Sequence, residues 1–141
     1  MNAPTSEAAP APFAAGVFTA ADDGTGELLG GECTACAARH FPWRDYCPRC
    51  GRPLDACSLG GRGTLYTYTV VRVRPPLGLP APYAVGYVDL EQGPRVFALL
   101  DPQAIAAFAI GMPLVLRVAP LGVDLAGQPC LRPYFTPRGG A

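Results

Sequence analysis

Two Cys-x-x-Cys pairs restrict what this chain can fold into more than any other feature of its sequence. Ten residues separate the pairs, and the four cysteines are Cys33, Cys36, Cys47 and Cys50. A Cys-x-x-Cys segment forms a tight turn, or knuckle, whose two sulfurs point at one spot, so two facing knuckles present four thiolates in tetrahedral geometry. The spacing therefore predicts a rubredoxin-like zinc ribbon.

A four-cysteine site leaves no open coordination position, so we expect one structural zinc per chain and no catalytic metal. Gly51 follows the second knuckle, where a positive φ is favourable, and Ala37 holds the equivalent place after the first. Two disulfides or a redox Cys-x-x-Cys are the alternatives, but a redox pair is expected singly and near a βαβ pattern. An iron site with the same ligands is normally built from knuckles much further apart in sequence.

The composition points to a protein that is covered by a partner. Half of the 141 residues are hydrophobic, 16% are charged, and the formal net charge is zero. This balance gives no broad attraction to nucleic acid or to membranes, and the sparse polar surface indicates that another protein covers part of it. No apolar run reaches the roughly 18 residues of a membrane span.

The expected compartment is the cytoplasm. Residues 1–15 lack the basic region of a secretory signal, and the ligand thiolates must stay reduced. In a reducing compartment the two remaining cysteines, Cys57 and Cys130, are expected to be free thiols.

The chain divides into five expected segments. These are a flexible Ala/Pro-rich tail over 1–15, a short helical segment over 16–29, the zinc ribbon over 30–57, an OB-fold over 58–135 and a flexible C-terminus over 136–141. Strands are predicted over 64–73, 83–90, 95–100, 114–119 and 129–135. Between the third and fourth, Asp101 is expected to cap a short helix that stops near Gly111. Five strands with a helix in this place give a mostly β fold, the order of an OB barrel.

Candidates for catalysis are few. His40 is the only histidine, it lies four residues after a predicted zinc ligand, and no nucleophile motif accompanies it. A surface role, or a role supporting the metal ligands, is therefore expected for it rather than catalysis. Acidic residues stand singly at strand ends and turns, where they are ordinary. We predict no catalytic residue in this chain.

Binding of single-stranded nucleic acid is the alternative function. Tyr66 and Tyr68 are expected on one face of the first barrel strand, where Tyr87 and Phe97 could join them as stacking platforms. A groove that binds such strands normally shows a basic excess, which this chain lacks. Nucleic acid is therefore not the expected partner.

The assembled motifs resemble a known family, the zinc-ribbon/OB-fold accessory proteins of thiolase-like enzymes, also called domain-of-unknown-function family 35. The resemblance covers about residues 30–135. In the ribbon it is carried by the two knuckles, by Phe41-Pro42 with Arg44 and Tyr46 just after, and by Cys-Pro-Arg-Cys-Gly at 47–51. In the barrel it is carried by segments 63–71, 82–90 and 110–114.

The resemblance implies a non-catalytic subunit in a hetero-oligomer with a thiolase-superfamily enzyme that acts on acyl-CoA thioesters. Such a chain would not be an enzyme by itself. Family proteins can help to shape the acyl-CoA channel, so Arg39, Arg44 and Arg49 are candidates for contact with a CoA phosphate or with the partner. The alternative is that these arginines are only exposed surface residues that keep the ribbon hydrated. Trp43 either packs over the ribbon or contacts a partner or ligand.

Overall fold

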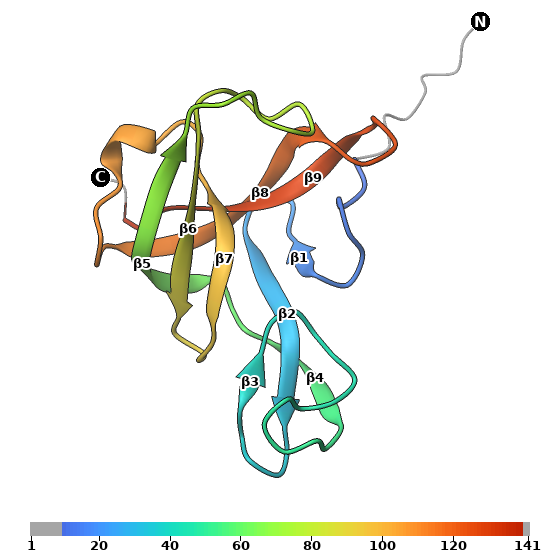
Figure 1. The fold of residues 1–141 in the computed structure, drawn as a ribbon. Coiled ribbons are helices and arrows are strands. Elements are labelled where there is room, and N and C mark those ends of the chain that lie inside the picture. Colours follow the sequence, from blue (N-terminus) through green and yellow to red (C-terminus); the bar gives the residue numbers. More distant parts are fainter. Residues whose placement is uncertain (1–9, 140–141) are drawn as a thin grey trace, which may run out of the picture.

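The computed structural model describes residues 10–139, and this part of the chain contains strands and a single turn of 3-10 helix (Figure 1). A four-stranded sheet comes first, built from β1 (Phe18–Ala20), β2 (Gly26–Cys33), β3 (Arg39–His40) and β4 (Leu54–Ser58). A barrel follows, built from β5 (Arg62–Val71), β6 (Tyr83–Leu90), β7 (Arg95–Leu100), β8 (Pro113–Val123) and β9 (Pro129–Pro137). In residues 10–139 no helix is long and apolar enough to cross a membrane.

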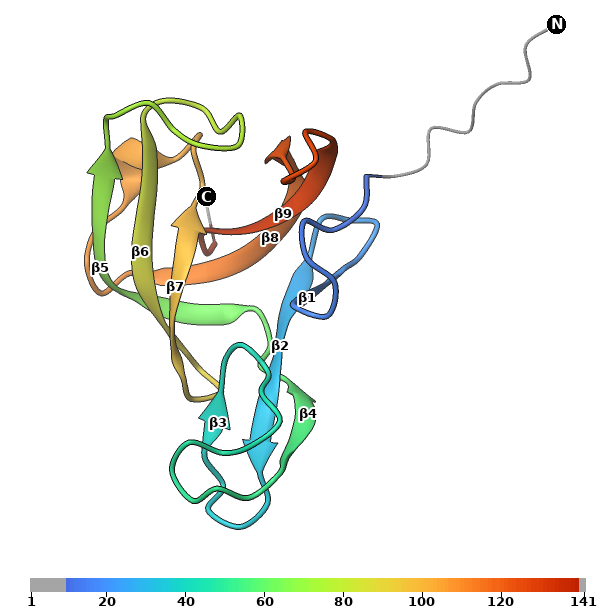
Figure 2. The same ribbon diagram turned by 45° about the vertical axis from the view of Figure 1, so that its right-hand side comes forward.

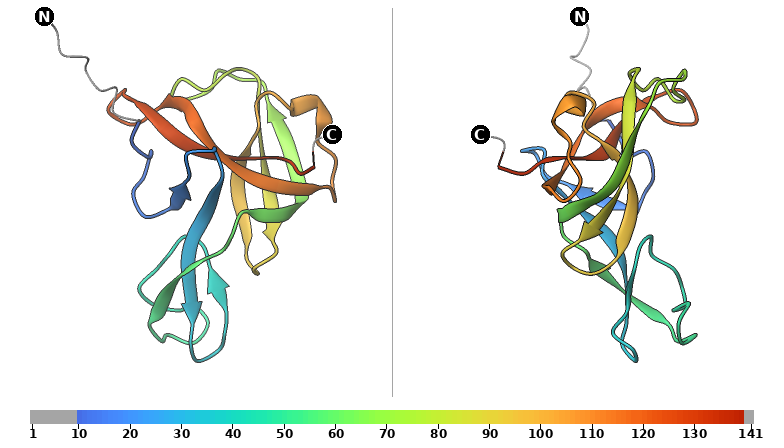
Figure 3. Two further views of the ribbon diagram at one scale, coloured as in Figure 1. Left: turned by 180° about the vertical axis from the view of Figure 1, so that it is seen from behind. Right: turned by 60° about the vertical axis from the view of Figure 1, so that its left-hand side comes forward.

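The barrel has the strand order β5-β6-β7-β9-β8 and is closed. All pairings are antiparallel except that of β7 with β9, which consists of one parallel bridge between Leu100 and Phe135. The 3-10 turn Ile105–Ala107 lies between β7 and β8 (Figure 3). This topology confirms the predicted OB-fold.

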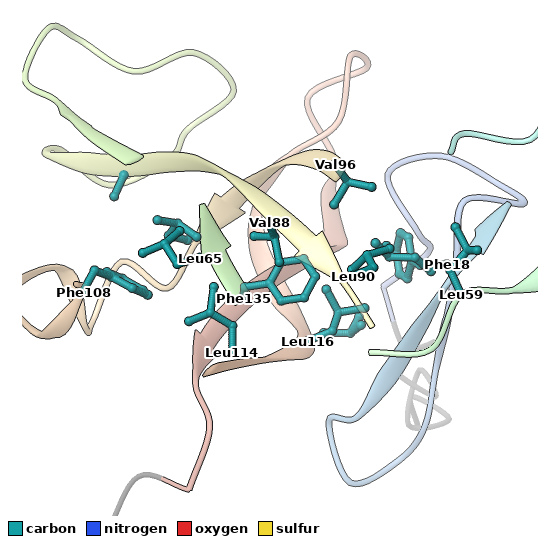
Figure 4. Packing of buried hydrophobic residues seen from close by; sticks show 14 residues of the cluster. Phe18, Leu59, Leu65, Val88, Leu90, Val96, Phe108, Leu114, Leu116 and Phe135 are labelled. Atoms are coloured by element: carbon teal, nitrogen blue, oxygen red, sulfur yellow. The ribbon is translucent and has the colours of Figure 1, made fainter. Parts of the chain in front are cut away.

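Period-two alternation places the apolar side chains inside this barrel. Along β6, Ala84, Val88 and Leu90 are buried whereas Tyr87 is exposed. At the centre of the core Phe135 is fully buried (Figure 4). The labelled side chains around it come from several strands and include Leu65, Val88, Leu114 and Leu116.

The long strand β2 joins the ribbon to the barrel (Figure 2). Its C-terminal half pairs with β3 and β4, and its N-terminal half pairs with β1. Leu28 of β2 and Leu59, just after β4, are buried in the barrel core. At Gly61 a Cβ atom would lie 2.5 Å from the backbone oxygen of Gly26, so only glycine permits this approach of the linker to β2. Leu28 and Leu59, at the junction with the ribbon, thus anchor the ribbon to the barrel core.

The helix predicted over 16–29 is wrong, because this segment forms the hairpin β1–β2. The side chain of Asp23 closes the turn, accepting hydrogen bonds from the Thr25 N–H at 3.0 Å and the Thr25 hydroxyl at 2.6 Å. Gly24 supplies a φ of 85°. Asp and Gly favour such a turn over a helix, and Phe18 and Leu28, which face each other across the hairpin, are both buried.

Both predicted tails are more ordered than expected where the structure describes them. The Phe13 N–H donates to the Leu131 carbonyl at 3.0 Å, and the Leu131 N–H donates to the Ala11 carbonyl at 2.8 Å. At the other end β9 runs to Pro137, and the Arg138 N–H donates to the Pro113 carbonyl. Residues 1–9 and 140–141 of the predicted tails lie outside the described residues.

The predicted helix cap at Asp101 is also wrong. The 3-10 turn begins at Ile105, and no side chain caps it. Asp101 instead accepts a hydrogen bond from the Gln103 N–H at 2.9 Å and another from the Thr136 hydroxyl at 2.9 Å. It therefore ties the end of β7 to β9 rather than starting a helix.

Replacing Phe135 by alanine should test whether the barrel centre dominates stability. We expect Phe135→Ala to lower the free energy of unfolding by about 3–5 kcal/mol, because a fully buried ring leaves a cavity. The matched control is Phe97→Ala, since Phe97 is 61% exposed and should cost less than about 1 kcal/mol. Urea unfolding of both variants measures this, and equal losses would contradict it.

Candidate metal centre

The two knuckles bring all four predicted sulfur ligands together. Their Sγ atoms lie within 4.8 Å of one another. Cys36 Sγ is 3.7 Å from Cys47 Sγ, and Cys33 Sγ is 3.2 Å from Cys50 Sγ. A tetrahedral zinc with Zn–S bonds of about 2.3 Å needs S···S separations of about 3.8 Å, so small adjustments bring the four sulfurs to the required geometry.

The backbone of the two knuckles is nearly the same. The Ala37 N–H donates to the Cys33 carbonyl and the Gly51 N–H donates to the Cys47 carbonyl, both at 2.8 Å. Each of these closing residues is in the left-handed region, with φ of 61° at Ala37 and 76° at Gly51. Ala37 thus takes the glycine-like conformation predicted for its place, although it carries a Cβ atom.

The electrostatics of the cluster favour a bound dication. The Cys36 N–H and then the contact with Cys50 lower the pKa of Cys33 to about 6. The pKa of Cys50 rises to about 12. A hydrogen bond from the Arg52 N–H lowers this pKa, but the contact with Cys33 and burial together raise it by more. Without a cation, ionisation of one thiol thus suppresses ionisation of its neighbour. A dication removes this conflict because it favours the thiolate form of every ligand.

His40 lies beside one of the four sulfur ligands. Its Nε2 atom is 3.5 Å from Cys47 Sγ, so the imidazole can donate to that thiolate. Cys57 is half-buried, Cys130 is buried, and neither belongs to the cluster. With four thiolates and no open position, the site suits structural zinc.

The structure brings together two of the four residues predicted to contact CoA or a partner, Arg39 and Arg49, and places the other two elsewhere. Arg39 lies where the ribbon meets the barrel, and its guanidinium donates to the Gln92 carbonyl at 3.0 Å and to the Gln92 side chain. Arg39 also lines a cleft of about 500 Å³ between ribbon and barrel, and His40 and the exposed Arg49 line this cleft too. Arg44 is exposed and lies outside this cleft. The predicted contacts themselves stay predictions.

Trp43 combines both interpretations that the sequence left open. Its side chain packs against β2, where a Cβ atom at Gly31 would lie 3.1 Å from the indole. It nevertheless remains 44% exposed. One face of the indole therefore covers the ribbon, and the rest is available to a partner.

The predicted aromatic face of the barrel is only partly formed. A bulge between Leu65 and Thr67 shifts the register of β5, so Tyr66 points outward whereas Tyr68 points inward and donates to the Phe108 carbonyl at 3.0 Å. The guanidinium of Arg95 instead lies over the Tyr66 ring, 3.4 Å from its centre. Strand alternation alone could not locate this bulge.

We predict one zinc per chain held by the four knuckle cysteines. The double variant Cys47→Ser/Cys50→Ser should lose the metal and the folded ribbon, because the metal supplies much of the ribbon's folding energy. The controls Cys57→Ser and Cys130→Ser should keep the metal. Elemental analysis of each purified variant decides this, and a metal content near zero in the unaltered chain would contradict it.

The positive φ at the two knuckles predicts opposite effects of exchanging alanine and glycine. Ala37→Gly should stabilise the zinc-bound ribbon by about 0.5–1 kcal/mol, because it relieves a strained left-handed alanine. Gly51→Ala should destabilise it by about 1 kcal/mol through the backbone alone, since its Cβ would meet nothing within 4 Å. Competition for zinc with a chelator measures both, and equal affinities would show that these turns are unstrained.

Comparison with known proteins agrees with both modules. Residues 22–55 match the family model described as "ChsH2, rubredoxin-like zinc ribbon domain", and residues 58–119 match "ChsH2, C-terminal OB-fold domain". A solved structure titled "Ltp2-ChsH2(DUF35) aldolase" contains a chain that is 32% identical, with a TM-score of 0.63. The likeness covers 79% of the present chain and 84% of that chain.

Curated relatives are similar to about half of this chain. A "DUF35 domain-containing scaffold protein" of Methanocaldococcus jannaschii is 39% identical over 72 residues, which are 49% of this chain and 51% of that protein. The "Benzoylsuccinyl-CoA thiolase subunit BbsA" of Thauera aromatica is 35% identical over 75 residues, which are 52% of this chain and 51% of that protein. The chain thus spans about half the length of these curated relatives. It belongs to the ChsH2-type DUF35 family of proteins, in which a zinc ribbon precedes an OB-fold.

Proposed function

We propose that this chain is a non-catalytic accessory subunit of a thiolase-superfamily complex that acts on acyl-CoA thioesters. The observation that carries the proposal is the joint match of ribbon and barrel to the DUF35 chain of an aldolase, over 79% of the present chain. A relative named as a subunit of a CoA thiolase supports the same substrate class. The ribbon and barrel would hold the catalytic subunit in its active assembly.

The described residues offer no constellation of groups for catalysis. Four thiolates close the metal site, and the single histidine faces one of them. Among the described carboxylates, Asp89 binds Arg95 at 2.6 Å and Glu91 binds Arg138 at 3.0 Å. Carboxylates held in exposed ion pairs at turns are ordinary surface groups. Bond making and breaking would therefore belong to the partner.

The surface chemistry suits a protein partner. Large apolar side chains are exposed over both modules, in a chain without net charge. Those most exposed are Tyr46, Val73, Phe97, Ile110 and Leu125. Exposed aromatic and aliphatic groups of this kind are common at the centres of protein interfaces.

Contact with CoA is the finer part of the proposal. The guanidinium of Arg49 makes no hydrogen bond or ion pair with the described residues, and Arg49 lines the cleft between ribbon and barrel together with Arg39. A guanidinium in that position suits a phosphate oxygen. We further place the complex in the cytoplasm, where the zinc thiolates would stay reduced.

Nucleic-acid binding has one observation in its favour. Tyr66, Tyr87 and Phe97 are exposed on neighbouring strands, and the Tyr87 and Phe97 ring centres are 5.3 Å apart. The cation beside them is Arg95, however, and Asp89 binds it through both carboxylate oxygens. This neutral face would attract a phosphate backbone poorly, so the accessory function is the better supported of the two.

Mixing purified subunits tests the proposal. The chain alone should give no release or consumption of free thiol from a CoA thioester, and adding it to its thiolase-like partner should raise turnover at least tenfold. The double variant Cys47→Ser/Cys50→Ser should lose this effect together with binding, because the ribbon unfolds. Turnover by this chain alone would contradict the proposal, as would a shift of single-stranded oligonucleotides at physiological salt without binding to the enzyme.

A further inference from the structure

Among the described strands, β7 is paired along its full length on only one of its two edges. On one side it pairs with β6 from Arg95 to Leu100. On the other side its single partner among the described strands is β9, and that pairing is confined to Leu100 and Phe135. The edge from Arg95 to Ala98 is thus unpaired in the part of the chain that the structure describes. Figure 2 shows β7 at the end of the layer that it forms with β5 and β6, on the side that faces β8, β9 and β1.

The register shows which backbone groups face this open edge. The Leu90 N–H donates to the Pro94 carbonyl at 3.0 Å, so Pro94 directs its carbonyl toward β6. Residues at alternate positions repeat this direction, so Val96 and Ala98 direct their N–H and C=O groups toward β6. Arg95, Phe97 and Leu99 direct theirs to the other side, where the bridge to β9 uses the Leu99 carbonyl and leaves the groups of Arg95 and Phe97 open. Exposed donors and acceptors in a row form a template for a further strand.

An apolar cleft of about 350 Å³ runs along the same edge. Four consecutive residues, Val96 to Leu99, line it. Because successive side chains of a strand point to opposite faces, a cleft that touches all four must follow the strand edge and its backbone. Other lining residues include Phe13, Leu28, Pro42, Leu116 and Phe135.

The charge of the cleft restricts what can enter it. Arg132 is the one charged residue in the lining, and it is 7% exposed. Its guanidinium donates to the Leu121 and Val123 carbonyls and lies 5.2 Å from the Phe13 ring centre, so its donors are directed largely into the protein. A suitable occupant is therefore uncharged and apolar where it enters the cleft.

The protein already uses strand addition on the neighbouring strand β9. Residues 11–13 run parallel to β9 and exchange two backbone hydrogen bonds with Leu131. This segment fills part of the edge of β9 and leaves the edge of β7 open. Residues 1–9 are an unsuitable occupant because their sequence holds one large apolar side chain, Met1.

We propose that the open edge of β7 receives an extended apolar segment of a partner protein, which adds a strand and buries alternate side chains in the cleft. The N–H and C=O groups of Arg95 and Phe97, together with the Leu99 N–H, would bind its backbone. Its inward side chains would contact Leu28 and Leu116, and its outward ones would contact Phe97. That this partner is the thiolase-like subunit rests on the proposed function, whereas the strand geometry does not.

A peptide probe tests the geometry with the full chain alone. The probe has seven residues, in which threonine and valine alternate between two terminal lysines. In amide NMR spectra of the zinc-loaded chain, the Phe97 and Leu99 N–H signals should shift and exchange more slowly as the peptide is added. The Val96 and Ala98 signals should be protected beforehand. Shifts confined to other surfaces, or binding of 1-octanol in the cleft without any binding of the peptide, would overturn the proposal.

Two substitutions at one position separate backbone recognition from side-chain packing. Phe97→Pro removes an N–H that the fold does not use, and proline is tolerated at strand edges. Phe97→Ala removes only the ring. Peptide affinity should fall at least tenfold further in Phe97→Pro than in Phe97→Ala, with thermal unfolding and zinc content as folding controls. Equal affinities would contradict strand addition, and if Phe97→Pro does not fold, the amide shifts of the unaltered chain decide.

The complex separates failure of this inference from failure of the proposed function. Hydrogen exchange at Phe97 and Leu99 should slow at least tenfold when the chain is assembled with its thiolase-like partner. A stable, active complex in which these amides exchange as fast as in the free chain would overturn the strand proposal alone. Slow exchange with the peptide, but no assembly with the enzyme, would overturn the proposed function and leave the strand site standing.

Discussion

Repulsion among four thiolates, and its removal by a dication, is the constraint on which the rest of this structure depends. The ribbon has a very small core of its own, formed by Cys33, Cys47 and Leu54. Metal binding can supply on the order of 10 kcal/mol to such a module. The effect extends beyond the ribbon because β2 continues from the knuckle at Cys33 to Leu28 in the barrel core. The metal therefore fixes one strand that both modules share.

Features set by local chemistry could be predicted from the sequence. The spacing of the cysteines identified the metal ligands, and runs of β-branched and aromatic residues between turn signals identified the five barrel strands. Even Ala37 was predicted to occupy a glycine-like place, and its φ of 61° agrees. Each of these features depends on residues a few positions apart, so the pattern carries the information.

Features that depend on distant contacts could not be read in the same way. Residues 16–29 have weak periodicity, and the side chain of Asp23 and the burial of Phe18 and Leu28 decide for a hairpin. The bulge in β5 reverses the orientation of Tyr68 relative to Tyr66, although both fit one alternating strand. The hydrogen bonds from Arg39 to Gln92 join positions 53 residues apart, so only the folded chain reveals that this arginine holds ribbon and barrel together.

The segment from Arg39 to Pro42 connects the metal centre with the open side of the barrel. Arg39 binds the turn that precedes β7, and His40 faces the Cys47 thiolate. Phe41 packs against the barrel core, and with Pro42 it forms one wall of the apolar cleft beside β7. Four consecutive residues thus contact the barrel turn, the metal ligands, the core and the cleft. Because the knuckles on either side of this segment are held by the same metal ion, the position of the cleft wall depends on a metal that no residue of the cleft contacts.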